Sequence, residues 1–379
     1  MTTPDDRPIS TDTAIILPQR ERYAPGEAGA IALLAARLAG RDDRILGIAP
    51  AGAPYPAGSF TPVRPAAFGL SDTARYARGC VSALGSRLPD LIEVHNRPDV
   101  ALGIARALPH MPMLLVLHND PQGMRDARTP EARIALLRRM RIAGVSDWVR
   151  ARFLDGLPSS ADIMAVLPNC IDCKALPNPV PMAERRREIL FAGRIVADKG
   201  ADAFVRACAQ ILPRWPGWTA RMIGADRFGA DTPRTAFLDA LVPQARAAGI
   251  VMDGYRPHDV VLNAMAQAAV VVVPSRWPEP FGLTALESMA TGAALIASSK
   301  GALSWVVQNG GLIADPDEPA VLETALEHVL SDLPLRESLS AQGQARARLF
   351  DVAEARERLS VLRADVRARP FLSPEPAGP

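Results

Sequence analysis

The 379-residue chain has few cysteines and no long hydrophobic run. Its 4 cysteines are scattered, which excludes the framework of a disulfide-stabilised secreted domain. Cys170 and Cys173 form a lone CxxC with no second Cys/His pair, so we favour incidental reduced thiols over a zinc site. No apolar run approaches the roughly 20 residues that a membrane span needs. Residues 1–10 lack the apolar centre of a secretory signal, so we expect a cytoplasmic protein.

A large excess of either charge is also missing. The net charge is +2, whereas nucleic-acid-binding domains are usually strongly basic, so we expect no nucleic-acid partner. Lysine is rare: among 43 basic residues, only Lys174, Lys199 and Lys300 are lysines. A lysine inside a motif is therefore a candidate functional residue. The hydrophobic share of 48% is typical of a globular protein with a substantial core.

Short apolar runs alternate with helix-length segments, which is typical of parallel α/β architecture. The alternation pauses at a proline-rich linker, 176–182, and then restarts. In the first half, the expected strands are 13–17, 44–48, 91–94 and 113–117. In the second half, they are 188–192, 219–223, 250–252, 269–273 and 293–297. The chain length and this pattern predict two doubly wound, Rossmann-like domains that face a common cleft.

The same pattern predicts where the domains begin and end. We expect disordered tails at both ends, over residues 1–10 and 370–379. The N-terminal domain should span residues 11–178 and the C-terminal domain residues 179–348. Residues 349–369 should form a last amphipathic helix that packs back on the first domain.

The segment from Glu279 to Glu287, Glu-Pro-Phe-Gly-Leu-Thr-Ala-Leu-Glu, directly follows an expected strand and opens an expected helix. Backbone N–H groups and the helix dipole at Phe281 and Gly282 suit a bound phosphate. Because carboxylates accept paired hydrogen bonds from adjacent hydroxyls, we assign Glu287 to a ribose and Glu279 to a transferred sugar. The alternative is a helix-start charge and a solvated helix residue, which the apolar surroundings disfavour.

A second motif connects the first strand of the C-terminal half to its first helix. Gly193 and Gly200 permit tight backbone geometry there, and Arg194 and Lys199 lie between them. Two cations beside a helix start suit a diphosphate leaving group, whose charge grows as the glycosidic bond breaks. Since these cations would replace Mg²⁺, we expect no metal requirement. A pair of solvated loop charges is the alternative.

Two histidines end expected strands of the first half. His95 lies in Glu-Val-His-Asn-Arg-Pro, and His118 lies in Leu-His-Asn-Asp-Pro. A histidine at the carboxyl end of a strand is well placed to hydrogen-bond a substrate hydroxyl. We favour this role for His118 over a structural one, and leave both roles open for His95.

The two C-terminal motifs, in this order, resemble those of the family-4 retaining glycosyltransferases, which have the GT-B fold of two Rossmann-like domains. The resemblance is close over residues 188–317 and looser before them. It implies transfer of a sugar from a nucleoside diphosphate sugar, UDP- or GDP-linked, to an acceptor hydroxyl with retention of configuration and without a cofactor. Residues 11–178 would then face the acceptor, and residues 179–348 would bind the donor.

The resemblance also assigns roles to individual residues. The catalytic set comprises His118, Arg194, Lys199 and Glu279. The donor-binding set comprises Gly29, Gly193, Gly224, Tyr255, Arg256, Phe281, Gly282, Leu283 and Glu287. The acceptor-side set comprises Glu27, His95, Asn119 and Asp120. Gly29 lies in a segment that resembles the family's glycine-rich loop but keeps only one glycine of its usual pair, and Cys170 and Trp305 also depart from the family pattern.

The two His-Asn motifs further resemble a cell-envelope and spore-coat branch of the family, which implies an acceptor in polysaccharide or lipopolysaccharide biosynthesis. The stretch from Arg125 to Arg152 is rich in arginine, and within it 132–142 is expected as a basic amphipathic helix. Such a helix would meet the inner face of an anionic membrane, with a solvated arginine-rich face as the alternative. Two other functions are a nucleotide-sugar epimerase on this fold and a weakly catalytic sugar-nucleotide-binding protein.

Overall fold

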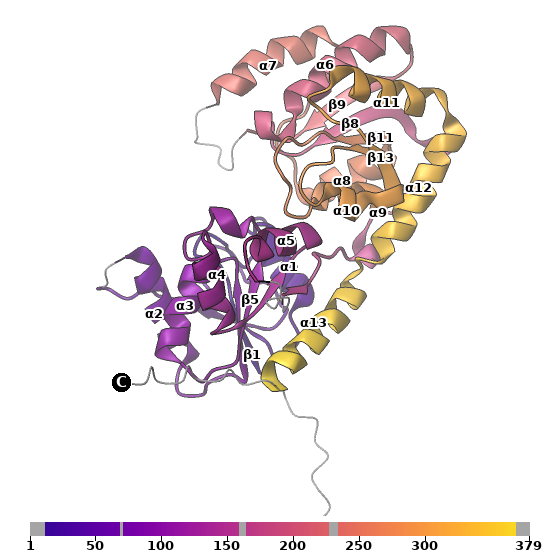
Figure 1. The fold of residues 1–379 in the computed structure, drawn as a ribbon. Coiled ribbons are helices and arrows are strands. Elements are labelled where there is room, and N and C mark those ends of the chain that lie inside the picture. Colours follow the sequence, from indigo (N-terminus) through magenta and orange to yellow (C-terminus); the bar gives the residue numbers. More distant parts are fainter. Residues whose placement is uncertain (1–11, 69–70, 159–163, 227–233, 369–379) are drawn as a thin grey trace, which may run out of the picture. The chain divides into compact units, whose positions relative to one another are not determined.

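The computed structural model describes residues 12–68, 71–158, 164–226 and 234–368 (Figure 1). The expected tails, 1–10 and 370–379, lie outside the described residues. The described residues divide into two compact units, the first lying within 12–170 and 353–368 and the second within 171–352. The chain therefore passes from the first unit to the second after residue 170, before the proline-rich linker, whereas the sequence suggested a boundary after residue 178. It passes back to the first unit at residue 353.

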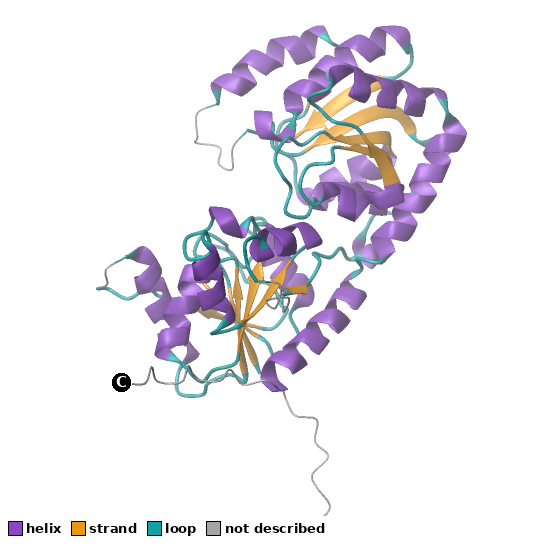
Figure 2. Ribbon diagram, in the orientation of Figure 1, coloured by secondary structure: helices purple, strands orange, loops and turns teal. Residues whose placement is uncertain are grey.

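The first unit contains a parallel sheet of 7 strands in the order β3-β2-β1-β4-β5-β6-β7. These strands are β1 (Thr13–Ile16), β2 (Arg44–Gly47), β3 (Ser59–Pro62), β4 (Leu91–His95), β5 (Met113–Leu117), β6 (Arg141–Gly144) and β7 (Ala165–Val166). The strand order reverses between β1 and β4, as in a doubly wound fold. The central strands are buried throughout because helices cover both faces of the sheet (Figure 2), which explains their continuous apolar sequence.

The helices of this unit are α1 (Ala30–Leu38), α2 (Asp72–Leu84), α3 (Pro98–Ala107), α4 (Pro130–Leu137), α5 (Asp147–Leu154), α13 (Val352–Ala368) and the 3₁₀ turn η1 (Pro121–Gly123). The expected basic helix 132–142 is wrong at its end, because α4 stops at Leu137 and Arg141 already belongs to β6. The packing of the C-terminal helix on this unit is confirmed. Arg363 of α13 pairs with Asp43 and Glu93.

The second unit contains a parallel sheet of 6 strands in the order β10-β9-β8-β11-β12-β13. These strands are β8 (Arg186–Ala192), β9 (Thr219–Ile223), β10 (Val251–Met252), β11 (Ala268–Val273), β12 (Ala294–Ala297) and β13 (Gly311–Ile313). The strand order reverses between β8 and β11. Ligands of open parallel sheets bind beyond the carboxyl ends of the strands at such a switch point.

Helices cover this second sheet as well (Figure 2). They are α6 (Ala201–Ile211), α7 (Ala236–Ala247), α8 (His258–Gln267), α9 (Leu283–Ala290), α10 (Leu303–Val307), α11 (Pro319–Ser331), α12 (Leu333–Arg348) and the 3₁₀ turns η3 (Cys173–Ala175), η4 (Met182–Glu184), η5 (Ala197–Lys199), η6 (Leu212–Arg214) and η7 (Gln308–Gly310). Within the described part of the chain, no helix combines the length and apolarity that crossing a membrane requires.

A buried arginine joins two helices of the second unit. Arg185 donates hydrogen bonds to the carbonyls of Met265 and Ala268 at the end of α8, and to the carbonyl of Thr291 at the end of α9. A cation suits these positions, since helix C-termini leave carbonyls without intrahelical partners and carry partial negative charge. Arg185 thereby fixes α8 and α9 relative to each other.

Candidate functional site in the second unit and polar cluster in the first

The two C-terminal motifs meet at the switch point of the second sheet. Lys199, at the end of η5, lies with its Nζ 2.5 Å from Glu279 Oε1. Ser275 Oγ, on the loop after β11, donates to the same Glu279 oxygen at 2.8 Å. A cavity of about 30 Å³ adjoins this pair and is also lined by Gly193 and Thr284. The cation and the carboxylate assigned to catalysis are therefore direct neighbours.

Two glycines shape the backbone beside this cavity. Gly193 follows β8 with φ of 150°, and Gly224 follows β9 with φ of 149°. A Cβ added to Gly224 would lie 1.7 Å from the carbonyl oxygen of Gly193, whereas a Cβ on Gly193 would have no atom of the described residues within 4 Å. Gly224 is therefore needed for close backbone packing. Gly193 leaves open space for an approaching ligand.

Replacing Gly224 with alanine should displace the Gly193 loop and lower the thermal stability. The positive φ alone costs an alanine about 1–3 kcal/mol, and the overlap with the Gly193 carbonyl adds to this. Gly249→Ala is the matched control, because Gly249 also has a positive φ, 71°, but open space around its Cα. We expect a larger fall in Tm for Gly224→Ala than for Gly249→Ala, and equal falls would contradict the close packing.

The start of helix α9 has the features expected of an anion site. Its N-cap, Gly282, has φ of 97°, and no side chain of the described residues caps it. Phe281 is buried and packs edge-on against Trp305 and Phe350, with ring centroids 6.2 and 5.6 Å away. Phe281 therefore offers only its backbone to a ligand. Trp305, one of the departures from the family pattern, completes this aromatic cluster.

The loop after β12 makes backbone contacts with Glu279. Gly301 forms a parallel bridge with Glu279, and the Ala302 N–H donates to the Glu279 carbonyl at 2.7 Å. A Cβ on Gly301, whose φ is 67°, would lie 2.4 Å from the backbone nitrogen of Glu279. This contact explains why a glycine occupies this position.

Glu287 has a partner that the sequence reasoning missed. His258, the first residue of α8, lies with Nε2 2.7 Å from Glu287 Oε1. The Glu287 side chain is 11% exposed and the His258 side chain 44% exposed. The signal in the sequence was the position of His258 just after Tyr255 and Arg256, which were assigned to donor binding. Tyr255 is 71% exposed, so its ring is accessible to a stacking partner.

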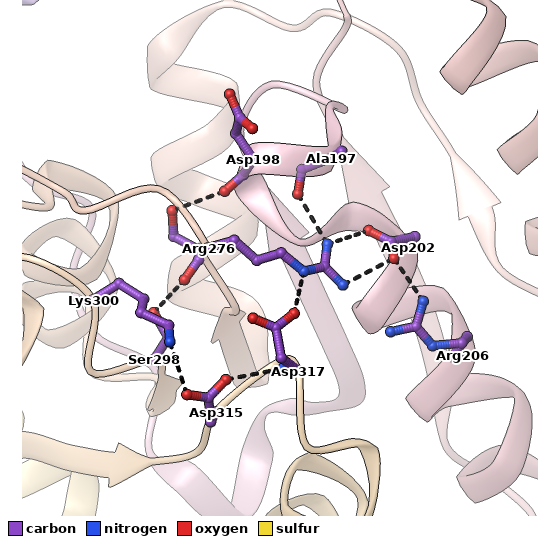
Figure 3. A network of polar contacts seen from close by, with 10 residues as sticks. Ala197, Asp198, Asp202, Arg206, Arg276, Ser298, Lys300, Asp315 and Asp317 are labelled. Carbon is purple, nitrogen blue, oxygen red and sulfur yellow. Dashed lines mark hydrogen bonds and ion pairs between the residues drawn. The ribbon is translucent and has the colours of Figure 1, made fainter.

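Arg276 organises the loops that carry Lys199 and Glu279 (Figure 3). Its backbone N–H donates to the Asp198 carbonyl at 2.8 Å, and its guanidinium contacts Asp202 at 2.6 Å and Asp317 at 2.5 Å. The guanidinium also donates to the carbonyl of Ala197. These contacts tie the loop after β8 to the loop after β11. Sequence reasoning missed this network, because its partners are far apart in the chain.

The two histidines of the first unit also lie together. His95 Nδ1 is 2.9 Å from His118 Nε2, and His95 Nε2 is 2.8 Å from Glu93 Oε1. The His118 backbone N–H donates to Asn96 Oδ1, and Asn96 has an unusual φ of 55°. Burial, and beside it the charge of His95, holds the pKa of His118 well below 6.5, against the opposite effect of Glu93. His118 is therefore neutral at pH 7.

Two other candidates of the first unit, Glu27 and Gly29, lie beside neighbouring residues of the same unit. Glu27 accepts hydrogen bonds from the backbone N–H groups of Ala51 and Gly52 at 3.0 and 2.7 Å, so it anchors the loop after β2. The expected donor contact at Gly29 meets an obstacle. The Glu21 carboxylate lies 2.5 Å from where a Cβ of Gly29 would be. A carboxylate in this place would repel a phosphate.

The remaining acceptor-side candidates differ from each other. Asp120 forms an ion pair with Arg152 at 3.0 Å and accepts a hydrogen bond from the Gln122 N–H. Its carboxylate therefore already has partners within the protein. Asn119 is exposed. No group of three or more His, Cys, Asp or Glu side chains among the described residues is placed to hold a metal ion.

Known proteins resemble this chain in sequence and fold. Residues 174–346 match the family model described as "Glycosyl transferases group 1". The putative glycosyltransferase YtcC of Bacillus subtilis is 25% identical over 307 residues, covering 76% of this chain and 75% of YtcC. The lipopolysaccharide core biosynthesis mannosyltransferase LpsB of Rhizobium meliloti is 30% identical over 236 residues, covering 56% of this chain and 61% of LpsB.

Among solved structures, Alr3699/HepE of Anabaena, in complex with UDP and glucose, superposes with a TM-score of 0.73 at 20% identity, covering 93% of this chain and 99% of HepE. This likeness concerns the fold. The two parallel-sheet, Rossmann-like units are those of the GT-B fold, as the sequence predicted. Residues 174–346 therefore carry a domain of the group 1 glycosyl transferase type, within a chain that has the GT-B fold.

Proposed function

We propose that the protein moves a glycosyl unit from a nucleoside diphosphate sugar to an acceptor hydroxyl with retention of configuration. The observation that carries this proposal is the contact between Lys199 and Glu279, next to the uncapped start of α9. A cation, a carboxylate and free helix-start N–H groups there offer complementary contacts to a diphosphate and to sugar hydroxyls.

The reaction is a substitution at the anomeric carbon. The bond from this carbon to the diphosphate oxygen breaks, and the bond to the acceptor oxygen forms on the same face. The acceptor's hydroxyl proton passes to the departing diphosphate oxygen. Arg194 and Lys199 stabilise the negative charge that grows on the diphosphate, in place of a metal ion. Glu279 accepts hydrogen bonds from the transferred sugar and positions it.

The nucleoside is held by the neighbouring elements. Glu287, steadied by His258, accepts from the ribose diol, and the exposed Tyr255 ring stacks on the base. Gly193 and the backbone at Gly282 and Leu283 approach the phosphates. HepE is described with UDP and glucose bound, which supports a nucleoside diphosphate sugar as donor, and we propose that this sugar is UDP- or GDP-linked. His118 contacts the donor sugar near its reacting carbon.

For the acceptor, we propose a chemical class and not a particular molecule. LpsB is described as acting in lipopolysaccharide core biosynthesis, which supports a cell-envelope glycan or glycolipid as acceptor. Arginine side chains on and around α4 would bring the cytoplasmic enzyme to the inner face of the membrane. Those that are exposed are Arg125, Arg128, Arg138 and Arg139. Arg133 is buried and donates hydrogen bonds to backbone carbonyls, and Arg152 pairs with Asp120. The exposed basic surface is therefore smaller than the sequence suggested.

A panel of UDP-, GDP- and ADP-sugars tests the donor. A donor at 100 times its Kd stabilises the folded protein by about 2.7 kcal/mol, so one nucleotide class should raise Tm clearly. The raised Tm should persist in EDTA, because no metal takes part. Release of nucleoside diphosphate should then require an acceptor. Free sugar formed without acceptor would indicate an epimerase, and binding without transfer would indicate a binding protein. No stabilisation by any sugar nucleotide would contradict the proposal.

A further inference from the structure

A series of buried, hydrogen-bonded side chains runs through the first unit from helix α13 to the residue after β5. Arg363 donates to Asp43 at 2.9 Å and to Glu93 Oε2 at 2.8 Å. Glu93 Oε1 meets His95, and His95 meets His118, as described above. All five residues are at most 9% exposed. Because buried charges are costly unless they are paired, each member depends on the next.

The charges decide where the protons lie. Burial alone would raise the pKa of Glu93, but the Arg363 charge and the His95 hydrogen bond outweigh it and lower the pKa to about 2. Glu93 is therefore ionised at pH 7 and can only accept a hydrogen bond. The proton facing it must be on His95 Nε2. If this is the single proton of the His95 ring, Nδ1 is an acceptor.

This arrangement sets the tautomer of the last ring. Opposite a singly protonated His95, His118 Nε2 faces an acceptor nitrogen, so Nε2 carries the single proton of the neutral His118 ring. Nδ1 is left as an acceptor, and no hydrogen bond to it is found within the described part of the chain. The two rings are also stacked, with centroids 5.1 Å apart, which restrains their rotation.

We propose that His95 carries a single proton, on Nε2, and that Glu93, His95 and Arg363 are positioning residues that thereby hold the proton of His118 on Nε2. His118 Nδ1 then accepts a hydrogen bond from a sugar hydroxyl. The sugar hydroxyl rests on the proposed function, whereas the tautomer does not. A protonated His95 would give the opposite result, since its Nδ1–H would donate to His118 and leave His118 Nδ1 as a donor. The chain of contacts thus selects which hydroxyl geometry His118 recognises, and it begins on the C-terminal helix.

Nitrogen–proton correlation spectra of ¹⁵N-histidine-labelled protein report the tautomer without any substrate. The chain has 5 histidines, so His118 can be assigned by its loss in His118→Gln. We expect wild-type His118 to be neutral and protonated on Nε2 at pH 7. In Glu93→Gln, the side-chain amide can either donate or accept, so His118 should become a mixture of tautomers. Glu357→Gln, exposed on the same helix α13, is the control and should leave the spectrum unchanged.

Turnover provides the second readout. Glu93→Gln and His95→Gln should lower kcat by about 10- to 100-fold, the range for losing a group that orients a substrate contact. The donor-induced rise in Tm should stay unchanged, because the second unit binds the nucleotide. His110→Gln, an exposed histidine, is the control. Circular dichroism without donor checks that the first unit of each variant is folded.

Three results would overturn this inference. They are a wild-type His118 protonated on Nδ1, a tautomer that Glu93→Gln does not change, and a changed tautomer with normal kcat. Failure of the proposed function looks different. In that case the wild-type protein shows no transfer at all, while the spectra still show the Nε2 tautomer.

Discussion

Replacing Lys199 with alanine should lower kcat by about 100-fold or more, which is the usual cost of removing one group that stabilises transition-state charge. Lys199 is the cation in contact with Glu279, and it ends η5, in the connection that follows the first strand of its unit. Without it, the Ser275 hydroxyl would be the one side-chain partner left to Glu279 Oε1 among the residues that the structure describes. The unneutralised carboxylate would then repel the diphosphate as its charge grows.

The initial rate of nucleoside diphosphate release at saturating donor and acceptor measures this effect. Lys174→Ala is the matched control, since Lys174 is an exposed lysine of the same unit. Lys199→Arg keeps the charge and should retain more activity than the alanine variant. Turnover of Lys199→Ala near the wild-type level would remove Lys199 from the leaving-group role and, with it, the central part of the proposed function.

Replacing Arg363 with methionine should lower the free energy of unfolding by about 3–5 kcal/mol, the range for removing one partner of a buried ion pair. The change leaves the carboxylates of Asp43 and Glu93 without their shared cation in the interior of the first unit. Arg358→Met is the control. Arg358 is exposed on the same helix, so its loss should change stability by at most about 0.5 kcal/mol.

The pH dependence gives this prediction a sign. The pKa of Glu93 in the folded protein, about 2, lies below its ordinary value of 4.5, so its ionisation stabilises the protein above pH 4.5. That contribution is lost as the pH falls from 4.5 toward 2. The gap between wild type and Arg363→Met should therefore narrow on acidification, because a protonated Glu93 no longer needs a cation. Urea unfolding followed by circular dichroism at pH 7 and pH 3 tests this, and a gap that widens at pH 3 would contradict it.

The strands and the two motifs could be predicted because their signals are local. Strands buried on both faces, such as β11, are continuous apolar runs, and each motif follows such a strand directly. Strand β6 could not be recognised in the same way. It has only 4 residues and follows α4 after a short connection, so its apolar residues appeared to continue the helical pattern.

The partners of the site residues could not be predicted, because they are tertiary contacts. Nothing local in the sequence shows that His258 meets Glu287, or that Arg276 joins the two motif loops. The same holds for Asp120, which was assigned to the acceptor side and which pairs with Arg152 in the structure. Glu93 is an exception with a visible local signal, since its carboxylate stands among the apolar residues Leu91, Ile92 and Val94 of one strand.

The return of α13 to the first unit has a consequence for synthesis. Residues up to 170 leave the ribosome long before Arg363, and until then Asp43 and Glu93 have no cation to bury against. The first unit therefore completes its interior only after translation of the second unit has finished. Expression of residues 1–170 alone would end with the same two carboxylates uncompensated, so a stable fragment of the first unit needs the last helix supplied as a separate peptide or by circular permutation.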